Sequence, residues 1–174
     1  MIFTRKQRTN VFRKQTEHEW TEKFWKFIED NLDKPWDWRC LSANPNITFD
    51  IVQSYPDKTW KWGMYGLSEN PNITFDIVLA HPNKPWNWCS LSGNQNITFD
   101  NVLAYPDKTW SWYSLSLNPN ITFDIVLAHP DKPWYWGCLS KNPNITFDIV
   151  LKYSNKPWEW DLLSLNPNIT FDIV

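Results

Sequence analysis

The sequence predicts an all-α fold, an α-solenoid built from six tandem repeats of about 24 residues behind an N-terminal capping helix. A Trp-x-Trp pair recurs six times, at intervals of 24, 26, 24, 24 and 24 residues. Each copy holds two short apolar segments bounded by proline and asparagine, as expected for a pair of short helices. Fourteen tryptophans stand beside only four glycines. A few large side chains must therefore supply most of the buried surface.

The repeats share one pattern, Asp/Asn-Lys-Pro/Thr-Trp-x-Trp-x-x-Leu-Ser-x-Asn-Pro-Asn-Ile-Thr-Phe-Asp-Ile-Val-Leu-x-His/Tyr-Pro. Repeat 2 has Gly-Met-Tyr-Gly where its neighbours have two residues, so an extra pair lies inside or beside its first helix. In repeat 3, Gln95 replaces the proline and Asn101 replaces the isoleucine. The predicted repeats span 33–56, 57–82, 83–106, 107–130, 131–154 and 155–174.

The first segment of each repeat predicts a helix that begins just after the aspartate or asparagine. In repeat 1, Asp33 is the predicted N-cap and Pro35 lies in the first turn, where a proline loses no hydrogen bond. Trp38 and Leu41 follow on one face. The helix should end before Pro45, because the residue before a proline avoids the α region.

The second segment predicts another helix, with part of it 3₁₀-like as an open alternative. Thr48 is its predicted N-cap and Asp50 favours the positive end of the helix dipole. Phe49 and Val52 are apolar, and Pro56 closes the segment. The β-branched residues leave a β-solenoid as the alternative, but the segment does not alternate cleanly between apolar and polar residues. Helices this short depend on stacking for stability.

The two ends of the chain differ in character. Residues 1–15 form a basic segment, and residues 16–32 read as an amphipathic capping helix with an apolar stripe. The residues of that stripe are Trp20, Phe24, Phe27 and Ile28, with Trp25 beside it. No comparable cap is apparent at the other end, which predicts either a longer array or end-to-end self-association.

The repeat pattern resembles two known kinds of repeat over residues 33–174. Its length and its Trp-x-x-Leu-Ser-x-Asn-Pro-Asn-Ile-Thr core resemble the leucine-rich repeat variant. That resemblance implies an α-helix paired with a short 3₁₀ helix in a right-handed superhelix, without an iron-sulfur cluster because the cysteine-rich N-terminal region is missing. The pattern is also similar to the Trp-rich repeats in uncharacterised proteins of giant nucleocytoplasmic DNA viruses, which implies little about function.

The remaining motifs have structural explanations, and we expect no enzyme, metal site or cofactor. Asn46-Ile47-Thr48 and its counterparts match the N-glycosylation pattern, yet they fall where asparagine makes a turn and threonine caps a helix. His81 and His129 share their position with tyrosines. The aspartate at each second helix is explained by the helix start. The unpaired cysteines are Cys40, Cys89 and Cys138.

The predicted function is a non-catalytic scaffold that binds other proteins, host factors among them if the viral resemblance holds. Two positions vary between repeats, directly after the first tryptophan and directly after the serine, and repeat proteins place specificity at such positions. The large apolar residues at these positions are Tyr135, Leu117 and Leu165, and the charged candidates are Lys61, Glu69 and Lys141. A recently expanded array with no refined binding site is a further alternative.

Nucleic-acid association is the second hypothesis, and a purely structural self-assembling protein is the third. A lysine recurs in every repeat, at Lys34, Lys58, Lys84, Lys108, Lys132 and Lys156. These lysines either follow a phosphate backbone or cover tryptophan faces at a solvated edge. The phosphate-binding candidates in the basic segment are Arg5, Lys6, Arg8, Arg13 and Lys14. We expect an intracellular protein, because no secretory signal or membrane span is apparent.

Overall fold

The computed structural model describes residues 19–169 and confirms the all-α prediction. Within these residues every regular element is helical and no strand occurs. Residues 19–29 form a helix, repeats 1 to 5 each contribute a first helix and a second helix, and repeat 6 contributes a first helix. The basic segment 1–15 and the second helix predicted for repeat 6 lie outside the described residues, wholly or in large part.

The helices come in pairs along the chain. The first helices are α2 (Trp38–Ser42), η1 (Leu67–Glu69), α5 (Trp88–Gly93), α7 (Trp112–Leu117), α9 (Trp136–Lys141) and α11 (Trp160–Leu163). The second helices are α3 (Phe49–Ser54), α4 (Phe75–Ala80), α6 (Phe99–Ala104), α8 (Phe123–Ala128) and α10 (Phe147–Lys152).

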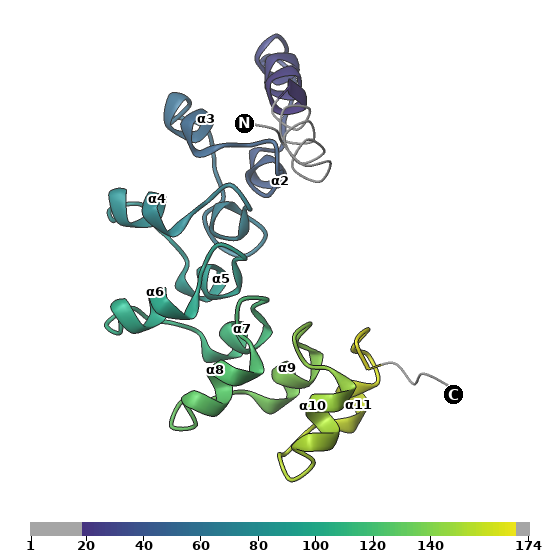
Figure 1. Ribbon diagram of the computed structural model, residues 1–174. Helices are drawn as coiled ribbons and strands as arrows, with labels where there is room; N and C mark the ends of the chain where they lie inside the picture. The colour runs from purple at the N-terminus through teal and green to yellow at the C-terminus, as the bar shows by residue number, and fades with distance from the viewer. Residues whose placement is uncertain (1–18, 170–174) are drawn as a thin grey trace, which may run out of the picture.

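The pairs stack into a curved array, open on one side (Figure 1). Helices α2, α5, α7 and α9 lie along its inner side, and α3, α4, α6 and α8 lie along its outer side. Consecutive first helices pack directly on one another. On the outer side, rings stand between consecutive second helices, as Phe49 shows with its centroid 4.7 Å from His81 and 5.8 Å from Trp86.

The predicted start of the first helix is wrong, because the N-cap lies between the two tryptophans. The side chain of Asp37 accepts hydrogen bonds from the backbone N–H groups of Arg39 and Cys40. The preceding segment makes a tight turn, in which the Trp36 N–H donates to the Lys34 carbonyl at 2.8 Å. Proline therefore precedes the helix and does not sit in its first turn. Equivalent caps come from Asn87 and Ser111.

The second helices begin where the sequence predicts. Thr48, Thr74, Thr98 and Thr122 each accept a hydrogen bond from a backbone N–H of the first turn. At Thr98, Asn101 completes a capping box. The second helices described are α-helices, so the 3₁₀ alternative does not apply to them. The 3₁₀ geometry occurs in repeat 2, in η1.

The two extra residues of repeat 2 are looped out at the start of its first helix. In repeat 3 the Leu91 N–H donates to the Asn87 carbonyl at 2.9 Å, a spacing of four residues. In repeat 2 the equivalent bond runs from the Leu67 N–H to the Lys61 carbonyl at 2.8 Å, a spacing of six. The loop leaves only the short η1 helix in place of a full turn of α-helix.

Buried asparagines join consecutive repeats along the inside of the array. The side-chain Nδ2 of Asn118 donates to the carbonyl oxygens of Ser92, Asn94 and Ile97 at 2.9, 3.0 and 3.3 Å. Its Oδ1 accepts from the Asn120 N–H at 2.8 Å, which fixes the Asn-Pro-Asn turn. The same bonds to serine and asparagine carbonyls recur at Asn70, Asn94, Asn142 and Asn166.

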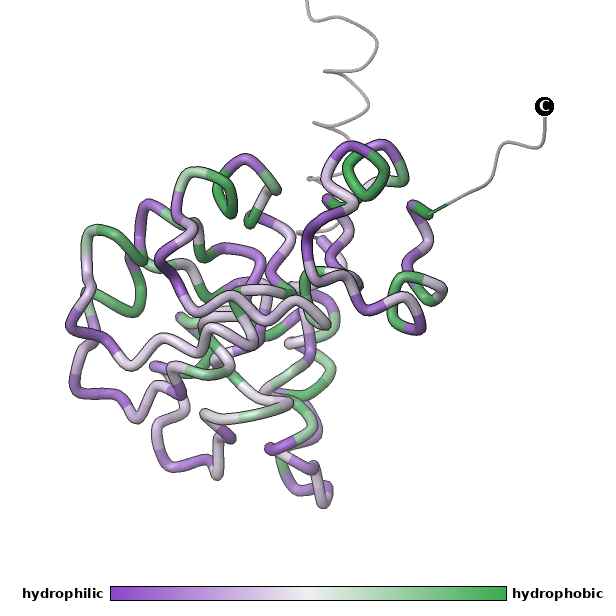
Figure 2. The backbone as a smooth tube through the Cα atoms, turned by 90° about the horizontal axis from the view of Figure 1, so that it is seen from below, coloured by the Kyte–Doolittle hydropathy of each residue, from purple (hydrophilic) through white to green (hydrophobic). Residues whose placement is uncertain are grey.

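Tryptophans form a second ladder through the core. The ring of Trp112 meets that of Trp134 edge-on, with centroids 5.0 Å apart, and the Trp134 Nε1–H donates to the His129 carbonyl at 2.8 Å. The core consists of two clusters of buried residues, one ending at Ile97 and one beginning at Phe99, and Trp110 packs against both. Figure 2 shows the apolar stretches of the helices separated by hydrophilic loops.

The helix at residues 19–29 covers the first repeat, as predicted, but with a different face. Ile28 is fully buried, and Phe24 and Trp25 pack against the core. Trp20 and Phe27 are 67% and 59% exposed, so the predicted stripe is too wide. The burial follows Phe24 and Ile28, which are four residues apart and share one helix face.

Candidate partner-binding groove

A groove of about 880 Å³ lies over η1, α5 and α7. These elements belong to the inner row of the array, where the curvature brings their exposed faces together (Figure 1). The lining comes from repeats 2, 3 and 4. Its residues are Met64, Tyr65, Glu69, Pro71, Asn87, Cys89, Ser90, Gly93, Asn94, Gln95, Tyr113, Ser114 and Leu117.

The helical period decides which residues reach the groove. In α5, Leu91 and Ser92 face the core and are fully buried. Cys89 and Gly93 lie on the opposite face of the same helix, because successive residues are rotated by about 100°. The corresponding residues of α7 are Tyr113 and Leu117, which also line the groove. The groove is therefore floored by the positions that packing leaves free to vary.

The insertion of repeat 2 forms one wall of the groove. Met64 and Tyr65 are 60% and 69% exposed. Tyr65 has φ 54°, a left-handed conformation that is uncommon outside glycine. Its N–H donates to Glu69 at 3.1 Å, and the Lys61 ammonium lies 5.5 Å from the centre of its ring. Glu69 also accepts a hydrogen bond from Ser90 at 2.9 Å. These contacts hold the loop in a strained conformation that presents two large side chains.

Tyr113 lines the opposite end of the groove, and Tyr135 lies beside it, outside the lining. The rings of Tyr113 and Tyr135 meet edge-on, with centroids 5.7 Å apart, and the residues are 54% and 52% exposed. Tyr135 occupies the N-cap position of α9 but makes no capping hydrogen bond. Replacement of a capping side chain by a non-capping one costs about 1 kcal/mol of helix stability. The exposed ring thus stands where a polar cap would be more stable.

The proline of the Asn-Pro-Asn turn is replaced by Gln95 at the edge of the groove. The Gln95 carbonyl accepts a hydrogen bond from Asn120 at 2.6 Å, as the proline carbonyls do in other repeats. Its side chain is exposed and makes no hydrogen bond within residues 19–169. Both of the main departures from the repeat pattern, the insertion and Gln95, therefore line one groove.

Titratable groups at the tyrosine end favour their neutral forms. Burial raises the pKa of the Cys138 thiol, and the neighbouring Cys138 raises the pKa of Tyr113. Both groups are protonated at neutral pH, because their ordinary pKa values already exceed 8. Glu69 is the one acidic or basic side chain that lines the groove. The groove therefore presents a largely uncharged surface.

The structure unites part of the predicted partner-binding set. Leu117 and Glu69 line the groove. Tyr135 and Lys61 do not line it, but their side chains contact the lining residues Tyr113 and Tyr65. Lys141 is exposed at the end of α9. Leu165 is 70% exposed but lies beyond α11, outside the groove lining.

The sequence interpretation missed Met64, Tyr65, Tyr113, Cys89 and Gln95. The first two lie in the insertion, whose conformation no repeat pattern describes. Tyr113 and Cys89 directly follow the second tryptophan, and they were recoverable from the helical period, because that position is rotated away from the core. Gln95 was visible as a departure from the pattern, but its place at the groove depends on the stacking of repeats.

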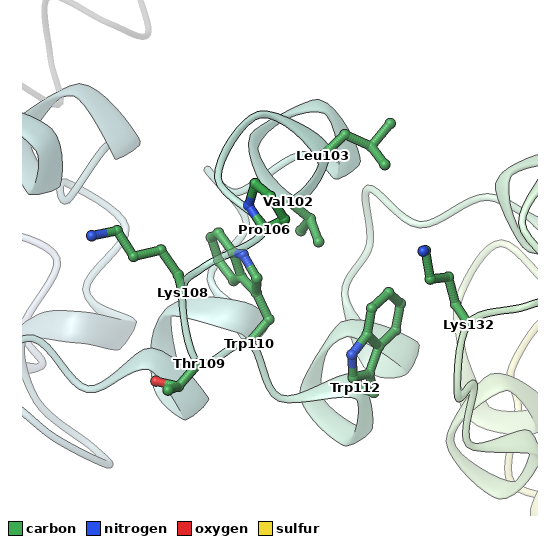
Figure 3. Close-up of a pocket in the computed structure, with 8 residues that line it drawn as sticks. All are labelled: Val102, Leu103, Pro106, Lys108, Thr109, Trp110, Trp112 and Lys132. Atoms are coloured by element: carbon green, nitrogen blue, oxygen red, sulfur yellow. The ribbon is translucent and has the colours of Figure 1, made fainter.

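The lysine row lies against the tryptophans. Lys58, Lys84, Lys108 and Lys156 stand over the rings of Trp38, Trp62, Trp88 and Trp136, with the ammonium 4.9 to 5.9 Å from the ring centre. Lys132 pairs with Asp131 at 2.9 Å. A smaller pocket of about 260 Å³ adjoins α6, and Figure 3 shows Lys108 and Lys132 on either side of Trp110 and Trp112 there. These contacts favour the packing interpretation of the row.

The remaining sequence candidates are the basic residues of segment 1–15 and the two histidines of the repeats. The phosphate-binding candidates Arg5, Lys6, Arg8, Arg13 and Lys14 lie outside the described residues. His81 and His129 stack on Phe49 and Phe99, as tyrosines do in other repeats.

The glycosylation-like asparagines are engaged in the fold. Asn120 Nδ2 donates to the Gln95 and Ile97 carbonyls, and Asn72, Asn96 and Asn144 make the same pair of bonds. Of the three cysteines, all unpaired, Cys40 and Cys89 are exposed and Cys138 is buried. In residues 19–169, no group of three or more His, Cys, Asp or Glu is placed to hold a metal ion. None of the described helices is long and apolar enough to cross a bilayer.

Comparison of the chain with family models, curated proteins and solved structures gives no match. The resemblance to the leucine-rich repeat variant and to viral Trp-rich repeats therefore stays an expectation from the repeat pattern.

Proposed function

We propose that the protein is a non-catalytic repeat scaffold that binds a segment of a partner protein in the groove over η1, α5 and α7. The observation that carries this proposal is the placement of the two irregular repeats. Among the departures from the repeat pattern, the insertion and Gln95 line the same groove, whereas Asn101 lies in α6 and completes a capping box. The insertion also breaks a local rule of stability, because Tyr65 has a positive φ, and such departures are expected at functional sites.

The surface has the composition of a protein-binding site. Met64, Tyr65 and Tyr113 are more than half exposed, and methionine and aromatic residues are enriched at interfaces. These exposed side chains lie together in one groove, and in protein interfaces a few such residues supply most of the binding energy.

Affinity capture with the tagged intact chain tests the proposal, using lysate treated or not treated with nuclease. The Tyr113→Ala variant removes one ring from the groove. Leu151→Ala is the matched control, because Leu151 is 59% exposed on the outer helix α10. We expect protein partners that survive nuclease, are lost with Tyr113→Ala and are retained with Leu151→Ala. Retention of every partner by Tyr113→Ala contradicts the proposal.

Nucleic-acid association through the basic segment and the lysine row stays a separate prediction. Partners lost on nuclease treatment, with binding that weakens steeply as salt rises, would support it. Intracellular localisation also stays a prediction.

A further inference from the structure

We infer that the occupant of the groove is a proline-rich segment in the polyproline II conformation. The inference rests on the proposed function and names the chemistry of its partner. It follows from the charge, the hydrogen-bonding groups and the repeat spacing of the groove.

Because the groove is nearly uncharged, we expect the central residues of the bound segment to be uncharged. Glu69 is the one charged lining residue, and two of its acceptor positions are taken by Ser90 and by the Tyr65 N–H. Cys138 and Tyr113 are neutral at the other end. A phosphate backbone or an acidic peptide finds no cationic lining here. One basic residue at the end of the segment would pair with the remaining lone pairs of Glu69.

The hydrogen-bonding groups favour a chain with free carbonyl oxygens. The side chain of Gln95 makes no hydrogen bond within residues 19–169. Asn87 caps α5 through its Oδ1, and its Nδ2 makes no hydrogen bond within the same residues. Tyr65 and Tyr113 bring phenolic donors. A polyproline II chain has no internal hydrogen bonds, so its carbonyls are available to these donors. An amphipathic helix satisfies its own backbone and would leave the same donors buried and unpaired.

The spacing of the aromatic residues also fits this conformation. Polyproline II rises 3.1 Å per residue with three residues per turn, or about 9 Å per turn. Packed helices lie about 8–10 Å apart, so one turn of the ligand spans one repeat of the array. Tyr65 and Tyr113, which line the groove, lie two repeats apart, and Tyr135 contacts the Tyr113 ring from outside the lining. Proline rings dock against aromatic surfaces of this kind with little loss of conformational entropy.

Selection from an unbiased library tests the inference on the intact chain. Random twelve-residue peptides displayed on phage are selected for binding, and the enriched peptides are synthesised and measured by fluorescence anisotropy. We expect prolines spaced three residues apart with one flanking Arg or Lys. We also expect affinity to fall about tenfold or more with Tyr113→Ala and Tyr135→Asn, and to stay unchanged with Leu151→Ala.

The outcomes separate this inference from the proposed function. Proline-free peptides that are lost with Tyr113→Ala would overturn the choice of occupant and leave the groove as a protein-binding site. Peptides that bind all variants equally, or no enrichment at all, would overturn both. Tyr135→Asn guards against misfolding as the cause of lost binding, because it introduces a better helix cap.

Discussion

One serine and one asparagine of the repeat pattern join neighbouring repeats through hydrogen bonds that the sequence pattern does not reveal. In repeats 1, 3, 4 and 5 the serine donates to the tryptophan carbonyl four residues back and accepts the N–H of the residue between the two tryptophans of the next repeat, as Ser92 does with Trp88 and Ser111. The asparagine two residues after the serine bonds to the preceding repeat through its side-chain amide. In residues 19–169 every buried side-chain nitrogen and oxygen has a partner. The polar residues of the repeat are therefore as fixed by packing as its tryptophans.

Removal of one buried asparagine should weaken the fold more than its size implies. Asn118→Ala removes the side-chain donor of the Ser92 carbonyl, one of two donors of the Asn94 and Ile97 carbonyls, and the acceptor of the Asn120 N–H. We expect a loss of about 3 kcal/mol in the free energy of unfolding, because buried groups left unpaired lose their full hydration. Chemical denaturation measures it. Asn155→Ala, at an exposed position, is the control and should change stability by less than about 0.5 kcal/mol.

A single substitution at Tyr135 should instead stabilise the fold. Tyr135→Asn supplies the missing cap of α9, so we expect the free energy of unfolding to rise by about 1 kcal/mol. Thermal unfolding followed by circular dichroism checks the direction. Asn87→Tyr is the reverse change in α5 and should lower stability by a similar amount, because Asn87 caps the Ser90 N–H at 2.8 Å. Equal melting temperatures for both variants would show that this position does not cap the helix.

At the scale of the element, each α-helix of the repeats is only four to six residues long, too short for independent stability. Caps and neighbours must define its ends. The loop of repeat 2 shows how far one element can depart while its neighbours hold the array, since Ser68 still accepts the Asn87 N–H at 3.0 Å. The irregular element thus keeps the bonds between repeats and changes only the exposed face.

Two glycines in this loop make a matched pair. A Cβ at Gly66 would collide with the carbonyl oxygen of Lys61, whereas a Cβ at Gly63 meets nothing closer than the Asn87 Nδ2 at 3.8 Å. We expect Gly66→Ala to displace Met64 and Tyr65 and to destabilise the fold by about 1–3 kcal/mol. Gly63→Ala should be nearly neutral. Denaturation of both variants gives the comparison, and equal stabilities would contradict the described loop.

At the scale of the whole molecule, stability is a sum over repeats and their interfaces. The buried residues divide into two clusters, and Trp110 packs against both. The junction therefore lies in the middle of the array. An interaction lost there affects coupling between the halves, and one lost within a cluster affects that cluster alone.

Replacement of Trp110 should uncouple the two halves. Trp110→Ala is expected to cost about 3–5 kcal/mol and to split a single unfolding transition into two. Trp134→Ala is the control, because Trp134 is 9% exposed and belongs to one cluster. It should lower stability similarly with less effect on cooperativity. Calorimetry distinguishes the two behaviours, and identical profiles would place the junction elsewhere.

Self-association is a second prediction for the whole molecule. Trp160 is 65% exposed, whereas its counterpart Trp136 packs edge-on against Trp158 with centroids 5.2 Å apart. If exposed rings at this end drive the predicted end-to-end contact, sedimentation should show oligomers that increase with concentration. Trp160→Ser should then abolish them, with Trp20→Ser, 67% exposed at the other end, as the control.

The sequence by itself determined the helical repeat, its length and the start of the second helices at threonine, because these depend on local capping and spacing. It also located the insertion and the variable positions. It did not determine the N-cap at Asp37, since the turn formed by Lys34 and Trp36 competes with a helix start at Asp33. Only the tertiary structure decided that the first helices line the inner side and that Gln95 joins the insertion in one groove. Both depend on contacts between repeats, such as the asparagine and tryptophan ladders that join residues 22 to 24 positions apart, and local sequence does not determine such contacts.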